Sequence, residues 1–577
     1  MADVTITGKA GQAAPAASAV DRVERLLMWV NRALLVAALV ALAYLLVVYV
    51  AYAANLIQFP FDYDQGEGFE LHDVMLFSQF AWPYANIETF PFYGSIYPPL
   101  YHILLVPFAW VFGPAYWYGR LFSFLTTLVT AYVIGYAVYR ETTRRTPDVD
   151  RRPLLLVAAL AGLAFLGSNI VYHIGPLFRQ HISMVMFETL AIVILAHVSA
   201  VDDQRRRRRL LLLGLGLLIA AGYTKQLAAF SAIAALAFLF VRNPRRALVW
   251  GIGFALVGGG IFAFLTVATG GHWWTQTIVA NVKDFDPNQA LGLLRTFVRS
   301  HLWLLIPAAV MVGYELYFDR LSIYSLWFVA TLVLNANSAG TWGAGDSYYA
   351  TPIAAMALLS GLFAARTVTR SWRFRDNVYA RWLIRPLRPL YPALTGVLLL
   401  VVPLLYLGYA RGVFHTPTTG PVFATVADLA GVEDNTGFDF YDPDGYVTLA
   451  YAQIGHFLTE ADRAGGERIV ELIEQVPDDV PVLSEEAGFS FATGRQIITN
   501  PVVLKILADV GAFDSSALVG MIERQEFGLI VLRAQFFPVE VNRAITMYYE
   551  ESERVPMNGF NYIIMTPRAE PLRESNP

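Results

Sequence analysis

The chain has 577 residues, of which 56% are apolar and 14% aromatic, while only 15% carry a charged side chain. Its mean hydropathy of +0.47 is too high for an ordinary soluble enzyme and indicates a polytopic membrane protein. The net charge of −4 gives no support to nucleic-acid binding, and the absence of cysteine excludes disulfides, thiolate metal sites and cysteine nucleophiles.

Residues 1–31 are predicted to be a disordered cytoplasmic tail, because the first 20 residues are rich in Ala, Gly, Thr and Ser and lack periodic apolar spacing. The apolar run near residues 33–56 is longer than the h-region of a signal peptide. Ala51-Tyr52-Ala53 resembles a cleavage site, but further apolar segments follow. We therefore expect an uncleaved first transmembrane helix.

Apolar segments long enough to cross about 30 Å of hydrocarbon recur up to residue 411. We expect about eleven crossings, near residues 33–56, 116–139, 154–172, 180–200, 210–223, 226–241, 247–268, 301–318, 322–337, 349–366 and 391–411. The segments on either side of Lys225 are short, which makes this pair the weakest part of the prediction. The stretch from Leu100 to Phe112 is too short to span and is predicted to be re-entrant or to lie at the interface.

Arginine residues are concentrated in alternate loops. They include Arg140, Arg144, Arg145, Arg151, Arg152, the run Arg205 to Arg209, Arg242, Arg245, Arg246 and seven more between Arg366 and Arg388. Loops with this composition face the cytoplasm. The pattern predicts a multi-pass protein of the plasma membrane with a cytoplasmic amino terminus, and it places the loop of residues 57–115 outside.

Residues 412–577 have the composition of a soluble domain and are predicted to form an extracytoplasmic α/β layer. Strands are expected at Val480–Leu483, Leu529–Leu532 and Tyr562–Met565, and helices at Tyr446–Ala464, Val502–Ala512 and Ser515–Gln525. The acidic patch Glu433–Asp444 matches no calcium-loop template. The domain contains no nucleotide fingerprint, nucleophile elbow or zinc spacing.

The first outer loop contains Asp62-Tyr63-Asp64-Gln65-Gly66-Glu67-Gly68. Carboxylates on glycine-containing backbone at the edge of a membrane commonly bind ions or transfer protons. Asp64 and Glu67 are the candidate catalytic residues, and a solvated acidic loop is the alternative. We interpret Asp62, Glu70 and Asp73 as structural. Phe69, Leu76 and Phe80 have the spacing of a helix that lies on the membrane surface.

Lys225 is predicted to lie at the outer turn of a helical hairpin, where a cation is costly unless it meets an anion. Together with Arg179 and Arg120, it is a candidate for holding a lipid phosphate or pyrophosphate. Snorkelling to the headgroups is the alternative, above all for Arg120. Glu188 lies about two turns inside its span, and we expect Arg179 or His181 to be its partner.

The loop of residues 270–299 begins with Gly270-Gly271-His272-Trp273-Trp274. Aromatic side chains with polar neighbours suit the faces of sugars, although tryptophan pairs also anchor helices at membrane interfaces. His272 and Trp273 are therefore candidate substrate contacts. Asp346 and Tyr348, just before the tenth span, are expected to close the same cavity.

These motifs resemble the GT-C superfamily of integral-membrane glycosyltransferases, in the branch that contains protein O-mannosyltransferases and lipid A aminoarabinose transferases. The resemblance covers roughly residues 33–411 and rests on Asp64-Gln65-Gly66-Glu67-Gly68, Tyr97-Pro98-Pro99-Leu100-Tyr101, Gly119-Arg120-Leu121, Thr224-Lys225-Gln226 and Gly345-Asp346-Ser347-Tyr348-Tyr349. It implies a catalytic transmembrane module over residues 32–411 and adds Tyr97 to the substrate contacts. The family usually has an adjacent Asp-Glu pair, whereas Asp64 and Glu67 are separated, so either could be the base.

The resemblance implies a hexosyl- or pentosyltransferase that takes sugar from a polyprenyl-phosphate donor on the outer face. Inversion by single displacement is expected: Asp64 or Glu67 removes the acceptor proton, while Lys225 and Arg179 stabilise the departing phosphate. Some relatives use a divalent metal, but no cofactor is required by these residues and no clear ligand set is present. The acceptor, whether lipid, glycan or protein, is not indicated.

Two other classes of protein fit the many spans. A lipid or sugar transporter or flippase commonly has inverted repeats and helices broken at the membrane midplane, and no such repeat is evident here. A non-catalytic partner of a glycan-assembly machine would use the outer domain as an interaction surface. The clustering of charged residues at the outer boundary favours the transferase.

Overall fold

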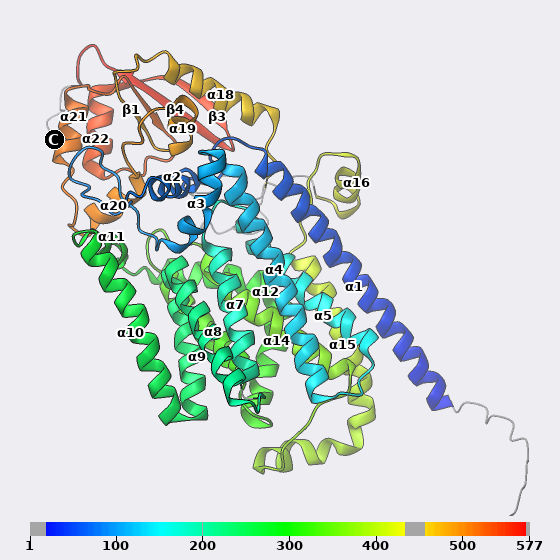
Figure 1. Cartoon of the computed structure of the whole chain (residues 1–577). Helices are drawn as coiled ribbons and strands as arrows, with labels where there is room; N and C mark the ends of the chain where they lie inside the picture. Colours follow the sequence, from blue (N-terminus) through cyan, green and yellow to red (C-terminus); the bar gives the residue numbers. More distant parts are fainter. Residues whose placement is uncertain (1–18, 199, 433–455, 573–577) are drawn as a thin grey trace, which may run out of the picture.

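The computed structural model describes residues 19–198, 200–432 and 456–572. It consists of a helical bundle with a small α/β domain at one end (Figure 1). The helices of the bundle and its loops are α1 (Ala19–Ile57), α2 (Glu67–Ser78), α3 (Leu100–Phe112), α4 (Tyr116–Arg145), α5 (Arg151–Leu166), α6 (Asn169–Ile174), α7 (His181–Val198), α8 (Gln204–Thr224), α9 (Ala229–Arg242), α10 (Pro244–Ala268), α11 (His272–Thr277), α12 (Pro287–Tyr317), α13 (Ile323–Ser338), α14 (Ala350–Val368), α15 (Tyr391–Gly412) and α16 (Pro421–Ala430). Short helical turns connect some of them, at η1 (Gln226–Ala228), η2 (Val279–Asn281), η3 (Asp346–Tyr349), η4 (Ala380–Ile384) and η5 (Arg385–Leu390).

The segments that were predicted to cross the membrane are largely helical, but the one at residues 154–172 is broken at Gly167 and Ser168, between α5 and α6. Within the described residues, seven helices are long and apolar enough to span, namely α1, α4, α7, α10, α12, α14 (with the preceding turn η3) and α15. Helices α5, α9 and α13 have 16, 14 and 16 residues, and α8 opens with a run of arginines. A polytopic helical architecture is therefore confirmed, while the total of eleven crossings stays a prediction.

The first helix begins earlier than predicted. Residues 19–31 were assigned to a disordered tail, but α1 begins at Ala19. Extending a helix costs little once a nucleus exists, and the apolar segment that follows supplies that nucleus. Leu26, Leu27 and Met28 are also good helix formers. Residues 1–18 lie outside the described residues.

Helix α14 forms the centre of the bundle. All of its residues from Ala350 to Thr367 are buried, and it packs against α4, α5, α7, α12 and α13. Most of its side chains are small, which allows neighbouring helices to approach closely. The turn η3 immediately precedes α14, so the central helix fixes the position of that turn.

The two ends of the bundle differ in character. The loops between α4 and α5, α7 and α8, α9 and α10, and α14 and α15 carry the arginine clusters, and all lie at the end opposite the α/β domain (Figure 1). The amino-terminal end of α1 lies at this arginine-rich end as well. The segregation of loops agrees with the predicted topology, and the side of the membrane that each end faces stays a prediction.

The first loop folds into two helices between the bundle and the α/β domain. Helix α3 has the predicted bounds of Leu100–Phe112. Helix α2 was predicted to lie on the membrane surface, but its apolar residues Phe69, Leu71 and Val74 are buried within the protein. They pack against Tyr93, Tyr101 and side chains of the α/β domain. Phe80 follows the end of α2 and is 87% exposed.

The described residues of the α/β domain form a four-stranded sheet, with strands β1 (Val482–Ser484), β2 (Leu529–Leu532), β3 (Tyr549–Met557) and β4 (Phe560–Pro567) in the order β1-β2-β4-β3. Strands β1 and β2 are parallel, with Val482 opposite Leu529, and the other pairs are antiparallel. The three predicted strands correspond to β1, β2 and β4. Strand β3 was missed because it is an edge strand rich in exposed glutamate.

The helices of this domain are α18 (Glu460–Glu474), α19 (Ala487–Thr493), α20 (Pro501–Asp509), α21 (Ser516–Glu523) and α22 (Val539–Tyr548). Helices α20 and α21 were predicted. The helix expected at Tyr446–Ala464 falls partly outside the described residues, and within them α18 begins only at Glu460, after a capping box at Thr459. The acidic patch Glu433–Asp444 also lies outside the described residues.

Candidate active site

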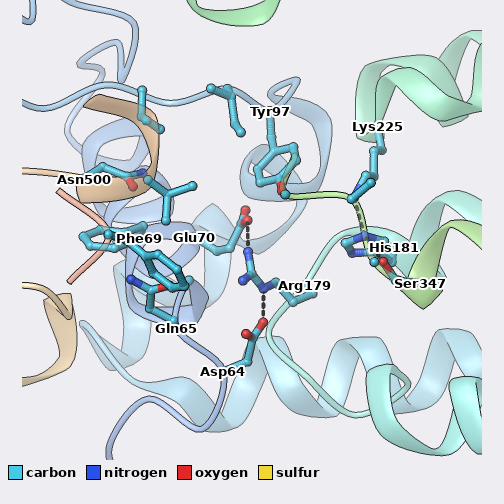
Figure 2. A pocket seen from close by; sticks show the side chains of 18 of the residues that line it. Asp64, Gln65, Phe69, Glu70, Tyr97, Arg179, His181, Lys225, Ser347 and Asn500 are labelled. Carbon is cyan, nitrogen blue, oxygen red and sulfur yellow. Dashed lines mark hydrogen bonds and ion pairs between the residues drawn. The ribbon is translucent and has the colours of Figure 1, made fainter. Parts of the chain in front are cut away.

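A cavity of about 410 Å³ lies where the first loop, the end of the bundle and the α/β domain meet (Figure 2). Five predicted site residues that are far apart in the sequence line it together: Asp64, Tyr97, Arg179, Lys225 and Tyr348. The other five do not line it: Glu67, Arg120, His272, Trp273 and Asp346.

Arg179 occupies the middle of the cavity between two carboxylates. Its Nε donates to Asp64 Oδ2 at 2.5 Å, and its Nη1 donates to Glu70 Oε1 at 3.2 Å. Burial opposes the charge of the guanidinium, but Asp64 and Glu70, with Tyr97, outweigh burial and raise the pKa of Arg179 well above its ordinary value. The second carboxylate oxygen of Asp64, Oδ1, is buried and has no hydrogen-bond partner in the part of the chain that the structure describes.

Gly66 permits this arrangement. A Cβ atom at this position would lie 2.3 to 2.6 Å from the guanidinium atoms of Arg179, which is closer than non-bonded atoms approach. The glycine between Asp64 and Glu67 therefore allows the guanidinium to lie against the backbone of the loop.

Lys225 lies at the other end of the cavity, after the last residue of α8. Its ammonium is hydrogen-bonded to His181 Nε2, which Ser347 Oγ also contacts at 3.1 Å. The rings of Tyr97 and Tyr348 lie 5.0 and 5.7 Å from the ammonium. Burial, with Arg179 nearby, holds the pKa of Lys225 well below its ordinary value. A buried cation beside a neutral imidazole and two aromatic rings is well placed to receive an anion.

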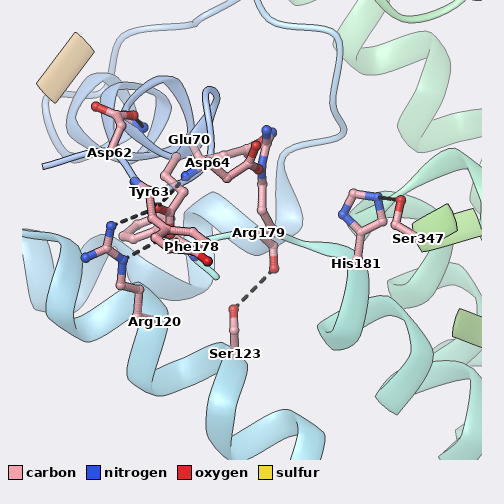
Figure 3. A network of polar contacts seen from close by, with 12 residues as sticks. Asp62, Tyr63, Asp64, Glu70, Arg120, Ser123, Phe178, Arg179, His181 and Ser347 are labelled. Atoms are coloured by element: carbon pink, nitrogen blue, oxygen red, sulfur yellow. Dashed lines mark hydrogen bonds and ion pairs between the residues drawn. The ribbon is translucent and has the colours of Figure 1, made fainter. Parts of the chain in front are cut away.

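Glu67 and Arg120 have a different role from the predicted one. Both side chains are fully buried and form an ion pair, with Arg120 Nη2 and Glu67 Oε2 2.7 Å apart (Figure 3 shows the surrounding network). Glu67 also accepts hydrogen bonds from the N–H groups of Tyr63 and Phe178, at 3.0 and 2.6 Å. The geometry corrects both expectations: Glu67 is no longer a candidate base, and Arg120 is no longer a phosphate ligand.

The expected partner of Glu188 was also wrong. Its carboxylate accepts hydrogen bonds from Ser231 and Thr351, each at 2.6 Å. Arg179 is engaged by Asp64 instead, because the backbone before α7 turns the arginine toward the first loop.

The predicted sugar contacts at the start of α11 lie away from the cavity. Trp273 is 2% exposed and packs edge to face against Tyr84, with ring centroids 4.9 Å apart, and against Phe262. This packing agrees with the alternative of a structural anchor. His272 is partly exposed and lies outside the cavity. Asp346 is buried and does not line the cavity either, although the next residue, Ser347, does.

Two acids that were interpreted as structural line the cavity. Glu70 bridges Arg179 and His102, whose Nε2 lies 2.6 Å from Glu70 Oε2. Asp73 accepts hydrogen bonds from the hydroxyls of Tyr93 and Ser95, at 2.8 and 2.5 Å, and burial raises its pKa to about 6. Their spacing of three residues places them on one face of a helix, and that signal could have found them once α2 was predicted to be buried.

The α/β domain contributes side chains that sequence patterns did not indicate. Asn500 lines the cavity and donates from Nδ2 to the carbonyl of Gly94 at 3.3 Å. Phe536 lines it as well, in a loop after β2 whose N–H groups bond to the Glu485 carboxylate. The cavity is therefore closed by two parts of the chain more than 400 residues apart.

Across residues 19–198, 200–432 and 456–572, no group of three or more His, Asp or Glu side chains is arranged to hold a metal ion.

The sequence matches no protein-family model and no curated protein. Among solved structures, the chain is similar to ArnT from Cupriavidus metallidurans in the apo state, at 14% identity and a TM-score of 0.55, over 91% of this chain and 97% of ArnT. ArnT bound to undecaprenyl phosphate matches over the same shares at 13% identity and a TM-score of 0.55. The Archaeoglobus fulgidus oligosaccharyltransferase in the apo form gives 12% identity and a TM-score of 0.43, over 90% of this chain and 73% of that one. The chain therefore shares its overall fold with ArnT.

Proposed function

We propose that the protein is a membrane glycosyltransferase that moves a sugar from a polyprenyl-phosphate donor to an acceptor hydroxyl. The observation that carries the proposal is the pairing, in one cavity, of a carboxylate with a buried cation. Asp64 and Lys225 both line the cavity and are 1% and 3% exposed, respectively. A glycosyl transfer needs a proton acceptor and an anion site, and these residues supply them.

The donor phosphate would lie beside Lys225. The ammonium is hydrogen-bonded to His181 and faces the rings of Tyr97 and Tyr348. None of these three side chains carries a negative charge, so a phosphate would provide a countercharge. Arg179 lines the same cavity and would contribute a second cationic group. The similarity in fold to an ArnT structure that contains undecaprenyl phosphate supports this choice of donor.

Asp64 is the proposed base. Its Oδ2 is oriented by Arg179, while Oδ1 has no hydrogen-bond partner among the residues that the structure describes and can accept a proton. In an inverting displacement the acceptor hydroxyl gives its proton to Asp64, and its oxygen forms a bond to the anomeric carbon. The bond from that carbon to the phosphate oxygen breaks, and the polyprenyl phosphate leaves with the electron pair, stabilised by Lys225 and Arg179.

Binding of undecaprenyl phosphate to the purified protein in lipid nanodiscs, measured by native mass spectrometry, tests the donor site. Lys225→Met should weaken binding about tenfold or more, as expected when a charge-assisted contact is lost. Lys505→Met is the matched control, because this lysine pairs with Asp509 in the α/β domain, outside the cavity. Equal binding by wild type and Lys225→Met would overturn the phosphate assignment.

Transfer is tested with a panel of radiolabelled polyprenyl-phosphate sugars and envelope extract from a deletion strain. Asp64→Asn should lower the rate by about 10²- to 10⁴-fold, the usual contribution of a general base, and should still bind undecaprenyl phosphate. Full transfer by Asp64→Asn would remove Asp64 as the base. Export of the sugar lipid without any transfer by the wild type would instead show a transporter.

A further inference from the structure

The cavity has two chemically different ends. Lys225 and its polar neighbours form one end, and Gln65, Phe69 and Asn500 lie at the other (Figure 2). Asp64 and the Arg179 guanidinium lie between the two ends. If the donor phosphate occupies the Lys225 end, a substrate at the opposite end would meet Asp64 from the other side of the reacting carbon.

Gln65 is the unusual residue at this second end. Its side chain lines the cavity and is only 4% exposed, yet the amide Nε2 has no hydrogen-bond partner among the described residues. A buried amide without a partner is destabilising, and a ligand with hydroxyl groups would offset that cost. Because Gln65 follows Asp64 directly, one ligand can contact both side chains.

The neighbours of Gln65 in the cavity also suit a carbohydrate. Asn500 presents a second side-chain amide, and Phe69 an aromatic ring that is 5% exposed. Amides both donate and accept hydrogen bonds, and aromatic rings pack against the C–H faces of sugars. Among the described residues that line the cavity, the only Lys and Arg side chains are Lys225 and Arg179, so these residues provide no lysine or arginine at the second end for an anionic headgroup.

We propose that Gln65, Phe69 and Asn500 form the acceptor subsite, and that the acceptor is a neutral carbohydrate with one hydroxyl directed at Asp64. This inference rests on the proposed transferase function and specifies its acceptor. The hydroxyl proton passes to the Asp64 carboxylate, and the acceptor oxygen bonds to the donor's anomeric carbon. The electron pair of the broken carbon–oxygen bond leaves with the polyprenyl phosphate.

The test is saturation-transfer NMR on the full-length protein in nanodiscs that contain undecaprenyl phosphate. The probes are maltotriose, mannotriose and arabinotriose, and a set of serine- and threonine-containing peptides is the competing class. Wild type should transfer saturation to the sugar protons of at least one triose. Gln65→Leu and Asn500→Leu should each weaken that binding about tenfold, as expected for the loss of one buried hydrogen bond, and keep undecaprenyl phosphate binding within twofold. Gln58→Leu, an exposed glutamine of the same loop, should match wild type.

The inference is overturned if wild type binds no triose, if it binds the peptides instead, or if both leucine variants bind the triose as wild type does. Gln65 belongs to the first loop and Asn500 to the α/β domain. If one of the two leucine variants fails to fold, the other still tests the acceptor subsite. Loss of undecaprenyl phosphate binding in Asn500→Leu would contradict the separation of the two ends. If wild type fails to bind undecaprenyl phosphate at all, the proposed donor site fails, whereas donor binding without triose binding refutes only the acceptor subsite.

Discussion

Glu67 and Arg120 form an ion pair in which neither side chain has any exposed surface. Arg120 Nε donates to Glu67 Oε1 at 3.0 Å and Nη2 donates to Oε2 at 2.7 Å. The guanidinium also donates to the carbonyls of Leu56, Phe59 and Phe61, at 2.6 to 2.8 Å. The pair therefore fastens the end of α1 and the start of the first loop to α4, and it holds the loop on which Asp64 lies.

Breaking this pair should unfold the first loop rather than remove a catalytic group. Glu67→Gln leaves the Arg120 charge buried without its counterion, a change that typically costs about 3–5 kcal/mol. We expect a clear fall in Tm in detergent, measured by intrinsic fluorescence, while Asp64→Asn melts close to wild type. Glu460→Gln is the control, since its side chain is 95% exposed. A Glu67→Gln protein with wild-type Tm and no transfer activity would restore Glu67 as a catalytic candidate.

Much of the fold could be predicted because apolar length and arginine distribution are local properties of the sequence. The segments around α4, α7, α10 and α12 stand out by hydropathy alone. The same local properties could not show which carboxylates of the first loop face the cavity and which are structural. Asp64 and Glu67 are three residues apart, yet one faces the cavity and the other faces Arg120, and only the packing of α2 against α4 decides which.

The proposed acceptor end of the cavity could not be predicted from the sequence for a related reason. Asn500 belongs to the α/β domain, and it reaches Gly94 across 406 positions of sequence. No spacing rule connects residues so far apart. Trp273 shows the reverse case: its aromatic motif suits a sugar site, but burial against Tyr84 makes it part of the core.

Gly66 should matter for the position of Arg179 and little for stability. In Gly66→Ala the new Cβ would overlap the guanidinium, which is the mobile end of a long side chain and can move away at small cost. Arg179 would then lose its alignment with Asp64, and a displacement of about 1 Å can lower a rate about 100-fold. We expect near-normal Tm with strongly reduced transfer. Gly345 lines the same cavity, and a Cβ atom added there would meet open space, so Gly345→Ala should retain activity. A Gly66→Ala protein as active as Gly345→Ala would contradict the proposed role of Arg179.

Asp73 should make the protein less stable as the pH rises through the weakly acidic range. Burial raises its pKa from 3.8 to about 6, so between these values the folded state binds more protons than the unfolded state, and stability falls with rising pH. Asp73→Asn can keep partners in Tyr93 and Ser95 because hydroxyls donate and accept. The Tm of wild type, relative to Asp73→Asn, should therefore decrease from about pH 4 to about pH 6. Parallel Tm curves across this range would show that the carboxyl titrates normally.

Binding of undecaprenyl phosphate should weaken at alkaline pH because of Lys225. Burial, with Arg179 nearby, holds the pKa of Lys225 well below its ordinary value, so the free protein loses this charge at a lower pH than an exposed lysine would. Only the protonated ammonium attracts the phosphate, and affinity should therefore decline as the pH rises toward the ordinary lysine pKa of about 10.4. Lys225→Arg should remove most of this decline, since the guanidinium stays charged throughout, whereas Lys225→Met should bind weakly at every pH. Native mass spectrometry or tryptophan quenching across the alkaline range distinguishes the three proteins. A wild-type affinity that does not change with pH, together with weak binding by Lys225→Met, would mean that Lys225 keeps its charge in the cavity.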